Sequence, residues 1–319
     1  MDERQRQEGK ASCRPSSFCT HRSSLPLPWW RRFFESPHSL RLAFFPSEHV
    51  TREQVAALDR LIAPWRPRMV LDLCCGPGRH LIPLAELGYP MVGLDAASLM
   101  VERAREQAQR REVPARLVRG DAQRLPFREA AFDVVLCLFN SFGYLQTDDE
   151  NAEIIREVSR CLRPEGRFLL DTRNRHYQFS HLPFSEVISL DGGGAVWLEC
   201  DRDPEGKRLI SQFRSPATGE VLHEASIRVY PLEELQHLFA EAGLDIERIG
   251  SGYDWRPFGA RSRELLILGR RRGTATHSRK TRNSGFSANG WLSLFSLTGR
   301  PPSGRGSGGW RRGRSGCAE

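Results

Sequence analysis

The sequence predicts an α/β protein with a doubly wound, mostly parallel sheet. Short apolar runs of strand length alternate with amphipathic helical patterns from Met69 to Asp171. A glycine-rich turn follows the first apolar run, in the segment MVLDLCCGPGRH at 69–80. From about residue 184 to 230 the pattern changes to short alternating runs separated by Gly, Pro and Asp turns, which is typical of antiparallel strands. We therefore expect a parallel sheet covered by helices on both faces, with a small inserted antiparallel region.

The elements follow from periodicity and turn signals taken along the chain. A capping box at Thr51 and Gln54 predicts the start of the first core helix, because these side chains satisfy free N–H groups. Pro64 and Pro67 end that helix before the first strand. The expected strands lie at 69–71, 91–94, 115–118, 132–139, 168–171, 244–249 and 265–268. The expected helices lie at 51–62, 79–87, 99–111, 149–162 and 231–242.

Both ends of the chain differ in composition from its centre. Residues 1–27 are polar and aperiodic, and residues 271–319 are rich in Gly, Ser and Arg, so both are expected to be disordered. One folded domain is expected over 28–270. It begins with an aromatic segment from Trp29 to Phe45, whose rings we expect to pack in the core, with a flap over a ligand as the alternative.

The charge is concentrated in the C-terminal segment. From Arg270 onward there are eleven Lys or Arg residues and one acid, so that the net charge of +8 leaves residues 1–269 near −2. A basic fold would indicate a polyanionic partner, whereas a basic tail shows only that an appended segment can attract one. A nucleic-acid partner is therefore not expected, except through the tail.

The cysteines and the hydropathy pattern bear on the compartment. The eight cysteines show no C-x-x-C spacing, so neither a disulfide framework nor a metal site is expected, and buried thiols in a reducing cytoplasm fit the pattern. No stretch approaches the roughly 18 apolar residues that a membrane span needs. The protein is predicted to be cytoplasmic, with no membrane partner.

The glycine-rich turn indicates a nucleotide-type site. Gly76 and Gly78 follow a strand and precede a helix, as in the dinucleotide fingerprint, but the third glycine of that fingerprint would fall on Leu81. Asp72 also places a carboxylate beside the loop. An anionic pyrophosphate is poorly served by a nearby carboxylate, whereas a ligand with a cationic amino-acid tail is well served.

Five blocks in order carry a family resemblance over about 70–171. The blocks are VLDLCCGPGRH, VGLD, GDAQRLPF, FDVVLCLFNSFGYL and LRPEGRFLLD. Together they resemble the class I S-adenosylmethionine-dependent methyltransferases, in particular their small-molecule-type members. The resemblance implies a Rossmann-like methyltransferase fold, that is, a seven-stranded sheet with its last strand antiparallel, and S-adenosyl-L-methionine as cofactor.

Two positions depart from the family pattern. Cys74 stands where the family has the first glycine of its loop, and this side chain fits if the backbone there does not need a positive φ. Ala97 stands where the family usually has a serine, with Ser98 following.

The resemblance also implies a set of cofactor-binding residues. Asp72 with Gly76 and Gly78 should surround the methionine tail, and Asp95 should accept hydrogen bonds from both ribose hydroxyls. Asp121 should meet the adenine amino group, although a simple turn residue is the alternative there. The predicted set is Asp72, Cys74, Gly76, Gly78, Asp95, Ala96, Asp121, Ala122, Leu138 and Asn140. No metal is expected.

Residues for the chemical step are harder to choose. Methyl transfer from a sulfonium is an in-line displacement, and a base is needed only if the acceptor enters protonated. We select Tyr144 and His176 as catalytic candidates because both follow strand ends. Further candidates at the same edge are His80, Tyr177, Tyr230, Arg173, Asn174 and Arg228.

The predicted function is methyl transfer to N or O of a small molecule. The inserted strands, at about 184–230, are expected on the substrate side. RNA or DNA methylation is one alternative, with the basic tail as its support. A non-catalytic S-adenosylmethionine-binding module is the other, because the motifs indicate cofactor binding and not transfer.

Overall fold

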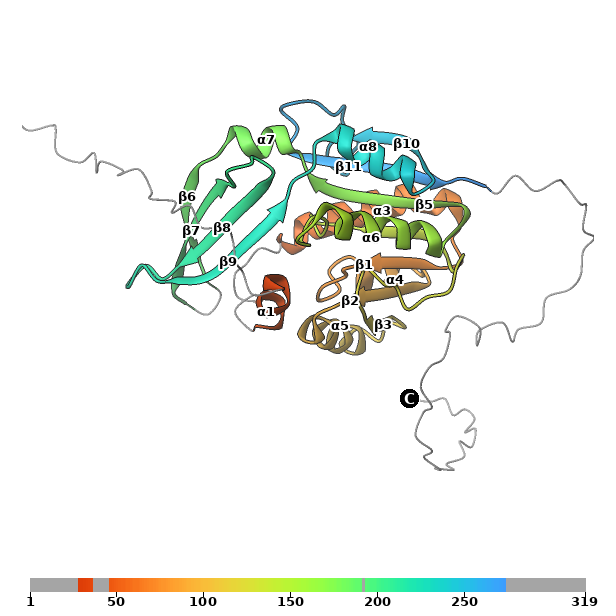
Figure 1. The fold of residues 1–319 in the computed structure, drawn as a ribbon. Coiled ribbons are helices and arrows are strands. Elements are labelled where there is room, and N and C mark those ends of the chain that lie inside the picture. The colour runs from red at the N-terminus through yellow and green to blue at the C-terminus, as the bar shows by residue number, and fades with distance from the viewer. Residues whose placement is uncertain (1–27, 37–45, 191–192, 274–319) are drawn as a thin grey trace, which may run out of the picture.

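Two sheets organise the chain in its computed structural model, which describes residues 28–36, 46–190 and 193–273. The predicted disordered segment 1–27 and all but the first residues of the predicted tail lie outside this range. The larger sheet carries the motifs, and the smaller one comes from the predicted inserted region (Figure 1).

The larger sheet has seven strands in the order β10-β11-β5-β4-β1-β2-β3. Every neighbouring pair is parallel except those that include β11, which runs antiparallel to β5 and β10. The predicted doubly wound α/β class, with its antiparallel last strand, is therefore confirmed. The strands are β1 (Val70–Leu73), β2 (Met91–Asp95), β3 (Arg116–Arg119), β4 (Phe132–Cys137), β5 (Leu162–Arg173), β10 (Leu244–Gly250) and β11 (Glu264–Arg271).

Helices cover both faces of this sheet, and their apolar sides form two cores. On one face lie α6 (Asp148–Cys161) and α8 (Leu232–Glu241), which bury residues such as Val158 and Phe239. On the other lie α3 (Glu48–Ile62), α4 (Leu81–Glu86) and α5 (Ser98–Arg110). A short 3-10 turn, η1 (Ala63–Trp65), ends α3. Because the strands are apolar on both faces, the sheet is fixed as the central layer.

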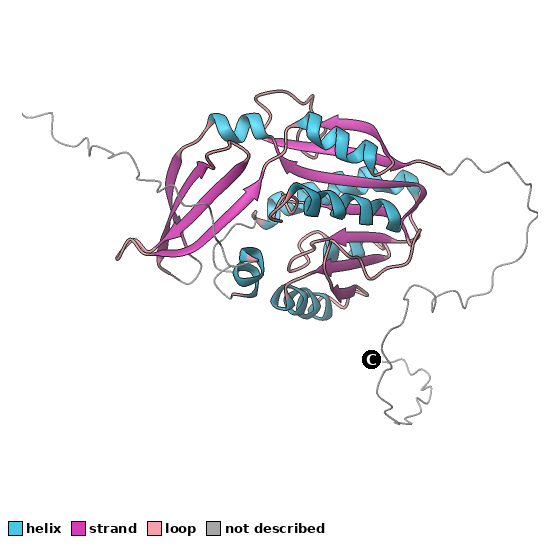
Figure 2. Ribbon diagram, in the orientation of Figure 1, coloured by secondary structure: helices cyan, strands magenta, loops and turns pink. Residues whose placement is uncertain are grey.

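The smaller sheet stands beside the larger one. It is antiparallel throughout, with strands β6 (Phe184–Ser189), β7 (Ala195–Arg202), β8 (Arg208–Arg214) and β9 (Val221–Arg228) in sequence order. Helix α7 (Arg175–Ser180) leads into it from β5, and α1 (Trp29–Glu35) lies between the two sheets (Figures 1 and 2). Trp29 and Phe33 of α1 pack on the inner face of this sheet, against Leu198, Phe213 and Ile227.

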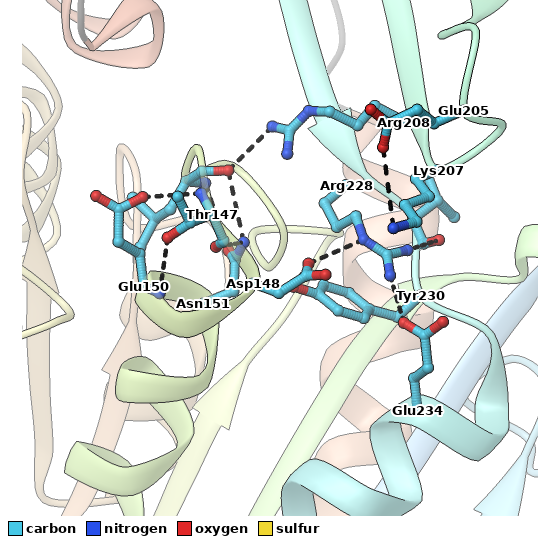
Figure 3. A network of polar contacts seen from close by, with 12 residues as sticks. Thr147, Asp148, Glu150, Asn151, Glu205, Lys207, Arg208, Arg228, Tyr230 and Glu234 are labelled. Atoms are coloured by element: carbon cyan, nitrogen blue, oxygen red, sulfur yellow. Dashed lines mark hydrogen bonds and ion pairs between the residues drawn. The ribbon is translucent and has the colours of Figure 1, made fainter.

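A buried arginine joins the smaller sheet to the larger domain (Figure 3). Arg228, at the end of β9, has a side chain only 3% exposed and pairs with Asp148 at 2.9 Å and with Glu234. Tyr230 donates its hydroxyl to the same Asp148 oxygen at 2.7 Å. The backbone N–H of Arg228 donates to Gly143 O at 2.7 Å. These contacts attach β9 to the start of α6, to α8 and to the loop after β4.

One local prediction was wrong. The capping box at Thr51 does not form, since α3 begins one turn earlier with Ser47 as N-cap, whose hydroxyl accepts from Val50 N. Residues 163–166 loop out of the pairing of β5 with β4, because Leu162 pairs with Phe132 and the ladder resumes at Arg167. Most other predicted bounds differ by a few residues. In the part of the chain described, no helix has the length and apolar character to cross a membrane.

Candidate functional site

The site lies at the carboxyl ends of β1, β2, β4 and β5, where parallel strands deliver their loops to one edge. Asp72, within β1, is 3% exposed, and its carboxylate accepts from the backbone N–H of Leu81 at the start of α4. Burial raises the pKa of Asp72 to about 7, although Arg79 acts to lower it. The carboxylate that we expected beside the methionine tail thus also interacts with the start of α4.

The loop after β1 bends through left-handed backbone conformations. Gly76 has φ +55° with open space beside it, and Gly78 has φ +88° with Ile82 Cδ1 only 2.7 Å from where a Cβ would stand. Cys74 has φ +59°, so the condition under which we expected a side chain to fit there is not met. A non-glycine residue in this region carries backbone strain, which the surrounding packing must hold.

Asp95, at the end of β2, binds the glycine-rich loop that follows β1. Its Oδ2 accepts from Gly76 N at 2.9 Å, and its Oδ1 accepts from Ala97 N at 2.9 Å. Burial raises the pKa of Asp95, and the backbone donors act to lower it. A carboxylate oxygen accepts more than one hydrogen bond, so both oxygens retain capacity for a ligand diol. The contact of Asp95 with the ribose hydroxyls stays a prediction.

The predicted adenine end is occupied by contacts within the fold. Asp121 Oδ1 accepts from Gln123 N at 3.0 Å, which is the turn role weighed as its alternative, and Oδ2 lies 3.5 Å from Arg31 Nη2. The side chain of Asp121 remains 36% exposed. Ala122 packs against the core, and Ala96 O accepts from Arg119 Nε at 3.2 Å. Adenine contact by Asp121 stays a prediction.

The end of β4 is strained, and β5 holds it in place. Phe139 and Asn140 take φ +56° and +60° in succession. Asp171 accepts from both, since its Oδ2 receives Phe139 N at 2.9 Å and its backbone oxygen receives Asn140 N at 3.1 Å. Leu138 O accepts from Ser141 Oγ at 2.8 Å. Consecutive non-glycine residues in this region are costly and mark a turn that its surroundings over-determine.

Helix α1 covers this edge of the sheet. Glu35 accepts from Ser98 N at 2.9 Å, from Ser98 Oγ at 2.7 Å and from Leu99 N at 3.3 Å, so it caps α5 from outside. At its other end the Trp29 ring stacks on Tyr144, with centroids 5.4 Å apart and planes 19° apart. One helix therefore contacts both the predicted adenine end and the predicted catalytic tyrosine.

The two predicted catalytic residues lie in different surroundings. Tyr144 is largely buried, burial raises its pKa, and the Arg173 guanidinium donates to its hydroxyl. His176 is exposed on α7 and lines an open recess of about 630 Å³ with residues such as Phe258 and Ala260. No residue of the predicted cofactor set lines that recess.

The further candidates serve mostly in contacts within the fold. His80 is buried, its Nε2 lies 3.0 Å from Gln54 Oε1, and burial holds its pKa well below the usual range. Tyr230 and Arg228 belong to the network at the base of β9. Asn174 caps α7 and donates to the loop carbonyls of Gly259 and Ser262.

Cysteine and metal chemistry find no support in the described residues. The cysteines placed there are all free thiols, and burial raises the pKa of Cys75 well above its usual range. Within those residues no group of three or more His, Cys, Asp or Glu side chains is arranged to hold a metal ion.

Comparison with known proteins identifies the family. A family model described as "Methyltransferase domain" matches residues 70–166. The cypemycin N-terminal methyltransferase of a Streptomyces species is 30% identical over 67% of this chain and 88% of its own length. A glycine/sarcosine N-methyltransferase of Parasynechococcus marenigrum is 34% identical over 67% of this chain and 82% of its own. The chain belongs to the class I S-adenosylmethionine-dependent methyltransferases.

A solved structure agrees on the fold of the methyltransferase. The CcbJ methyltransferase from Streptomyces caelestis superposes with a TM-score of 0.64 over 76% of this chain and 98% of that one, at 23% sequence identity. The predicted family, fold class, enzyme class and cofactor are thereby confirmed. The roles of individual residues stay predictions that the geometry supports to different degrees.

The site of the methyltransferase fits S-adenosylmethionine. Asp95 offers two oxygens to a diol, and the left-handed glycines leave backbone and open space beside them. Asn140 Oδ1, Arg79 Nη2 and Asp171 Oδ1 are buried and lack a hydrogen-bond partner among the described residues. Buried polar atoms are almost always paired in proteins, so these three atoms indicate ligand groups that the fold leaves to be supplied.

Sequence reasoning missed several residues that the structure brings to this edge. No role at the site was predicted for Arg79, Asp171 or Tyr253. Glu35 was not predicted to cap α5. Asp171 had one usable signal, because it follows an apolar strand at the edge where sites form. Tyr253 and Glu35 have no motif around them, and only the fold shows their partners.

Proposed function

We propose that this methyltransferase moves a methyl group by in-line displacement to the nitrogen or oxygen of a small-molecule acceptor. The observation that carries this proposal is the apolar inner face of the smaller sheet. That face, together with α1 and Tyr144, forms one buried cluster next to the end of β4. A cluster of this kind suits a small organic acceptor and not a polyanion, which basic side chains would have to hold.

The chemistry requires little of the protein beyond position. When bound, the cofactor supplies a methyl group that its sulfonium has already activated. The chain's own task is to hold the acceptor atom in line and to exclude water. Trp29 and the aromatic residues around it provide an apolar wall for this.

Polar groups in this cluster are donors. Trp29 Nε1 is buried without a partner among the described residues. Burial raises the pKa of Tyr144, so its hydroxyl stays protonated at neutral pH and donates instead of acting as a base. The acceptor is therefore expected to offer oxygen or nitrogen lone pairs and to reach the site as its free base.

Nitrogen is the favoured accepting atom. The names of both relatives reported above specify N-methylation, one of an N-terminus and one of glycine or sarcosine. Oxygen stays within the proposal because the donors of the cluster suit a hydroxylated acceptor equally.

Label transfer from the cofactor tests the proposal. The full chain is incubated with S-adenosylmethionine carrying an isotopically labelled methyl group and with panels of amines, amino acids, hydroxylated compounds, RNA and DNA. We expect label on small amines or hydroxyl compounds and none on nucleic acid. Label only on RNA or DNA, lost when residues 274–319 are removed, would favour the first alternative. Binding of S-adenosylhomocysteine without transfer to any acceptor would favour the non-catalytic one.

The two catalytic candidates are tested with the acceptor so found. Tyr144→Phe keeps the ring that stacks on Trp29 but removes the hydroxyl. It should lower kcat/KM for the acceptor about tenfold, which corresponds to one hydrogen bond, and leave the affinity for S-adenosylhomocysteine unchanged. His176→Ala is the matching test for the recess, and an unchanged kcat/KM would remove His176 from the catalytic set.

A further inference from the structure

Three neighbouring side chains around the end of β4 each carry an unpartnered polar atom. Asn140 N donates to Asp171 O at 3.1 Å, so these two residues are neighbours. The Arg79 guanidinium lies 4.5 Å from the centroid of the Phe139 ring, and Arg79 and Asp171 interact electrostatically. Each of the three side chains has one buried atom without a partner in the described chain, namely Asn140 Oδ1, Arg79 Nη2 and Asp171 Oδ1. Leaving such atoms unpaired is unfavourable, because each has lost its hydrogen bonds to water without a replacement.

The fold holds the rest of these side chains in place. Arg79 Nη1 donates to Gln54 Oε1 at 2.7 Å and to Thr51 Oγ1 at 3.2 Å, both on α3. These are the two residues that we had expected to cap that helix. The Arg79 guanidinium is therefore anchored on one side and leaves Nη2 available on the other.

Asp171 is anchored in the same way. Its Oδ2 accepts from Phe139 N at 2.9 Å and from the Tyr253 hydroxyl at 2.8 Å. Asp171 is only 3% exposed, and its other oxygen has no such contact. Arg79 and Asp171 therefore present one donor and one acceptor whose positions other residues fix, which is what a preorganised binding site requires.

The chemistry of the three atoms selects a ligand group. A guanidinium N–H is a donor for a carboxylate, while a carboxylate oxygen and an amide oxygen are acceptors for an ammonium. A single group that carries both is the zwitterionic end of an α-amino acid. S-adenosylmethionine has such an end, and the site faces the same strand edge as Asp95.

The other acid on this side of the sheet is already engaged. Asp72 lies in β1 and Asp171 in β5, the two strands that flank β4, but the Asp72 carboxylate interacts with the backbone N–H of Leu81 at the start of α4. Asp171 has an oxygen left over, whereas Asp72 lies within β1 and interacts with the start of a helix.

We propose that Arg79, Asp171 and Asn140 bind the amino-acid end of the cofactor, with Arg79 on its carboxylate and Asp171 and Asn140 on its ammonium. The proposal rests on the cofactor of the family and is independent of the acceptor. It adds Arg79 and Asp171 to the predicted cofactor set and assigns Asn140, already in that set, to the amino-acid end. Tyr253, Thr51 and Gln54 become positioning residues, since each fixes a binding group without touching the ligand.

The test compares cofactor products that differ only in the tail. Isothermal titration measures S-adenosylhomocysteine, its decarboxylated form, its deaminated form and methylthioadenosine, which lacks the whole amino-acid end. Wild-type protein should bind the intact product at least tenfold more tightly than each truncated one. Arg79→Met should abolish the preference for the carboxylate, and Asp171→Asn should abolish the preference for the ammonium. Neither variant should change the affinity for methylthioadenosine more than twofold.

Controls separate binding from folding. Arg103→Met removes an exposed arginine paired with Glu106 and should leave all four affinities unchanged. Asn140→Ala is a milder variant that should weaken the ammonium preference severalfold if Asp171→Asn does not fold. The proposal would be overturned if Arg79→Met and Asn140→Ala lowered the affinities for all four compounds equally. It would also be overturned if both variants kept the wild-type preference for the intact product over the truncated ones. Wild-type protein that binds none of the four would contradict the cofactor assignment instead.

Discussion

The predicted cofactor side and the proposed acceptor side of this methyltransferase are built in opposite ways. The predicted cofactor side, at the edge of the larger sheet, consists of carboxylates and backbone N–H groups, as in the pair Asp95 and Gly76. The proposed acceptor side, on the inner face of the smaller sheet, is a buried apolar cluster. One side can discriminate by hydrogen bonding, and the other by shape and a few donors.

The difference separates two tasks of one chain, which are to hold the cofactor and to hold the acceptor. A polar site tolerates little change, because each lost partner leaves a buried group unpaired. An apolar wall tolerates substitution as long as its volume is kept. We therefore expect a variant on one side to change the binding of that side's ligand and not of the other's. This requires that the Arg228 network, which connects the smaller sheet to the larger domain, is intact.

The largest expected effect concerns that connection. Arg228→Met removes the buried guanidinium that joins β9 to Asp148 and Glu234 (Figure 3). Both carboxylates are about half exposed, so the expected loss is about 2–3 kcal/mol of the free energy of unfolding, below the range for a fully buried pair. Thermal unfolding measures it, and Arg156→Met, which removes an exposed pair with Glu153, is the control. Equal stability of the two variants would mean that the network does not join the halves.

The next effect breaks the cofactor side alone. Asp95→Ala removes the acceptor of Gly76 N and Ala97 N together with the expected partner of the ribose diol. Charge-assisted hydrogen bonds of this kind contribute about 1.5–3 kcal/mol each, so the affinity for S-adenosylhomocysteine should fall about 100-fold. Isothermal titration measures this, with Asp121→Asn as the comparison. A larger loss in Asp121→Asn would assign the main nucleoside contact to the other acid.

A smaller effect sharpens the cofactor side by pH. Burial raises the pKa of Asp171 to about 6, with Glu264 acting in the same direction and Arg79 and Tyr253 acting to lower it. An ammonium needs the ionised carboxylate, so the affinity for S-adenosylhomocysteine should rise up to about tenfold from pH 5 to pH 7. Asp72, with a pKa of about 7, titrates in the same range, but it would affect ligands with and without the tail alike. The ratio of the affinity for S-adenosylhomocysteine to that for methylthioadenosine should therefore rise with pH in the wild type and stay flat in Asp171→Asn. A ratio that still rises with pH in that variant would contradict the assignment.

The smallest effect concerns the loop strain at Cys74. Cys74→Gly removes the cost of φ +59° but adds freedom to the unfolded chain, so the net change in unfolding free energy should stay within about 1 kcal/mol. Cys74→Val places a β-branched side chain in the same conformation and should destabilise by about 1 kcal/mol. Denaturant unfolding compares the two. A strongly destabilised glycine variant would show that the thiol packing, and not the backbone, determines this position.

The same comparison explains what could be predicted from the sequence. Asp95 and Gly76 could be assigned to one site in advance, because a strand end and a glycine turn lie at a spacing that many nucleotide sites share. The partners of Arg79 lie on α3 and those of Asp171 on β4 and near β11, at separations that no local pattern encodes. The capping box failed for this reason, since Thr51 and Gln54 bind Arg79 instead of their own helix. Cys74 failed because a family position was carried over without its backbone angle.

Helix α1 has a kinetic consequence for this enzyme. It touches Asp121 through Arg31, the start of α5 through Glu35 and Tyr144 through Trp29. One helix thus contacts both the predicted cofactor site and the proposed acceptor side. Release of the spent cofactor and release of the methylated product are therefore expected to require the same displacement of α1. Both products would then leave in one slow step that limits the rate of turnover. The first round of methyl transfer would be faster than the later ones.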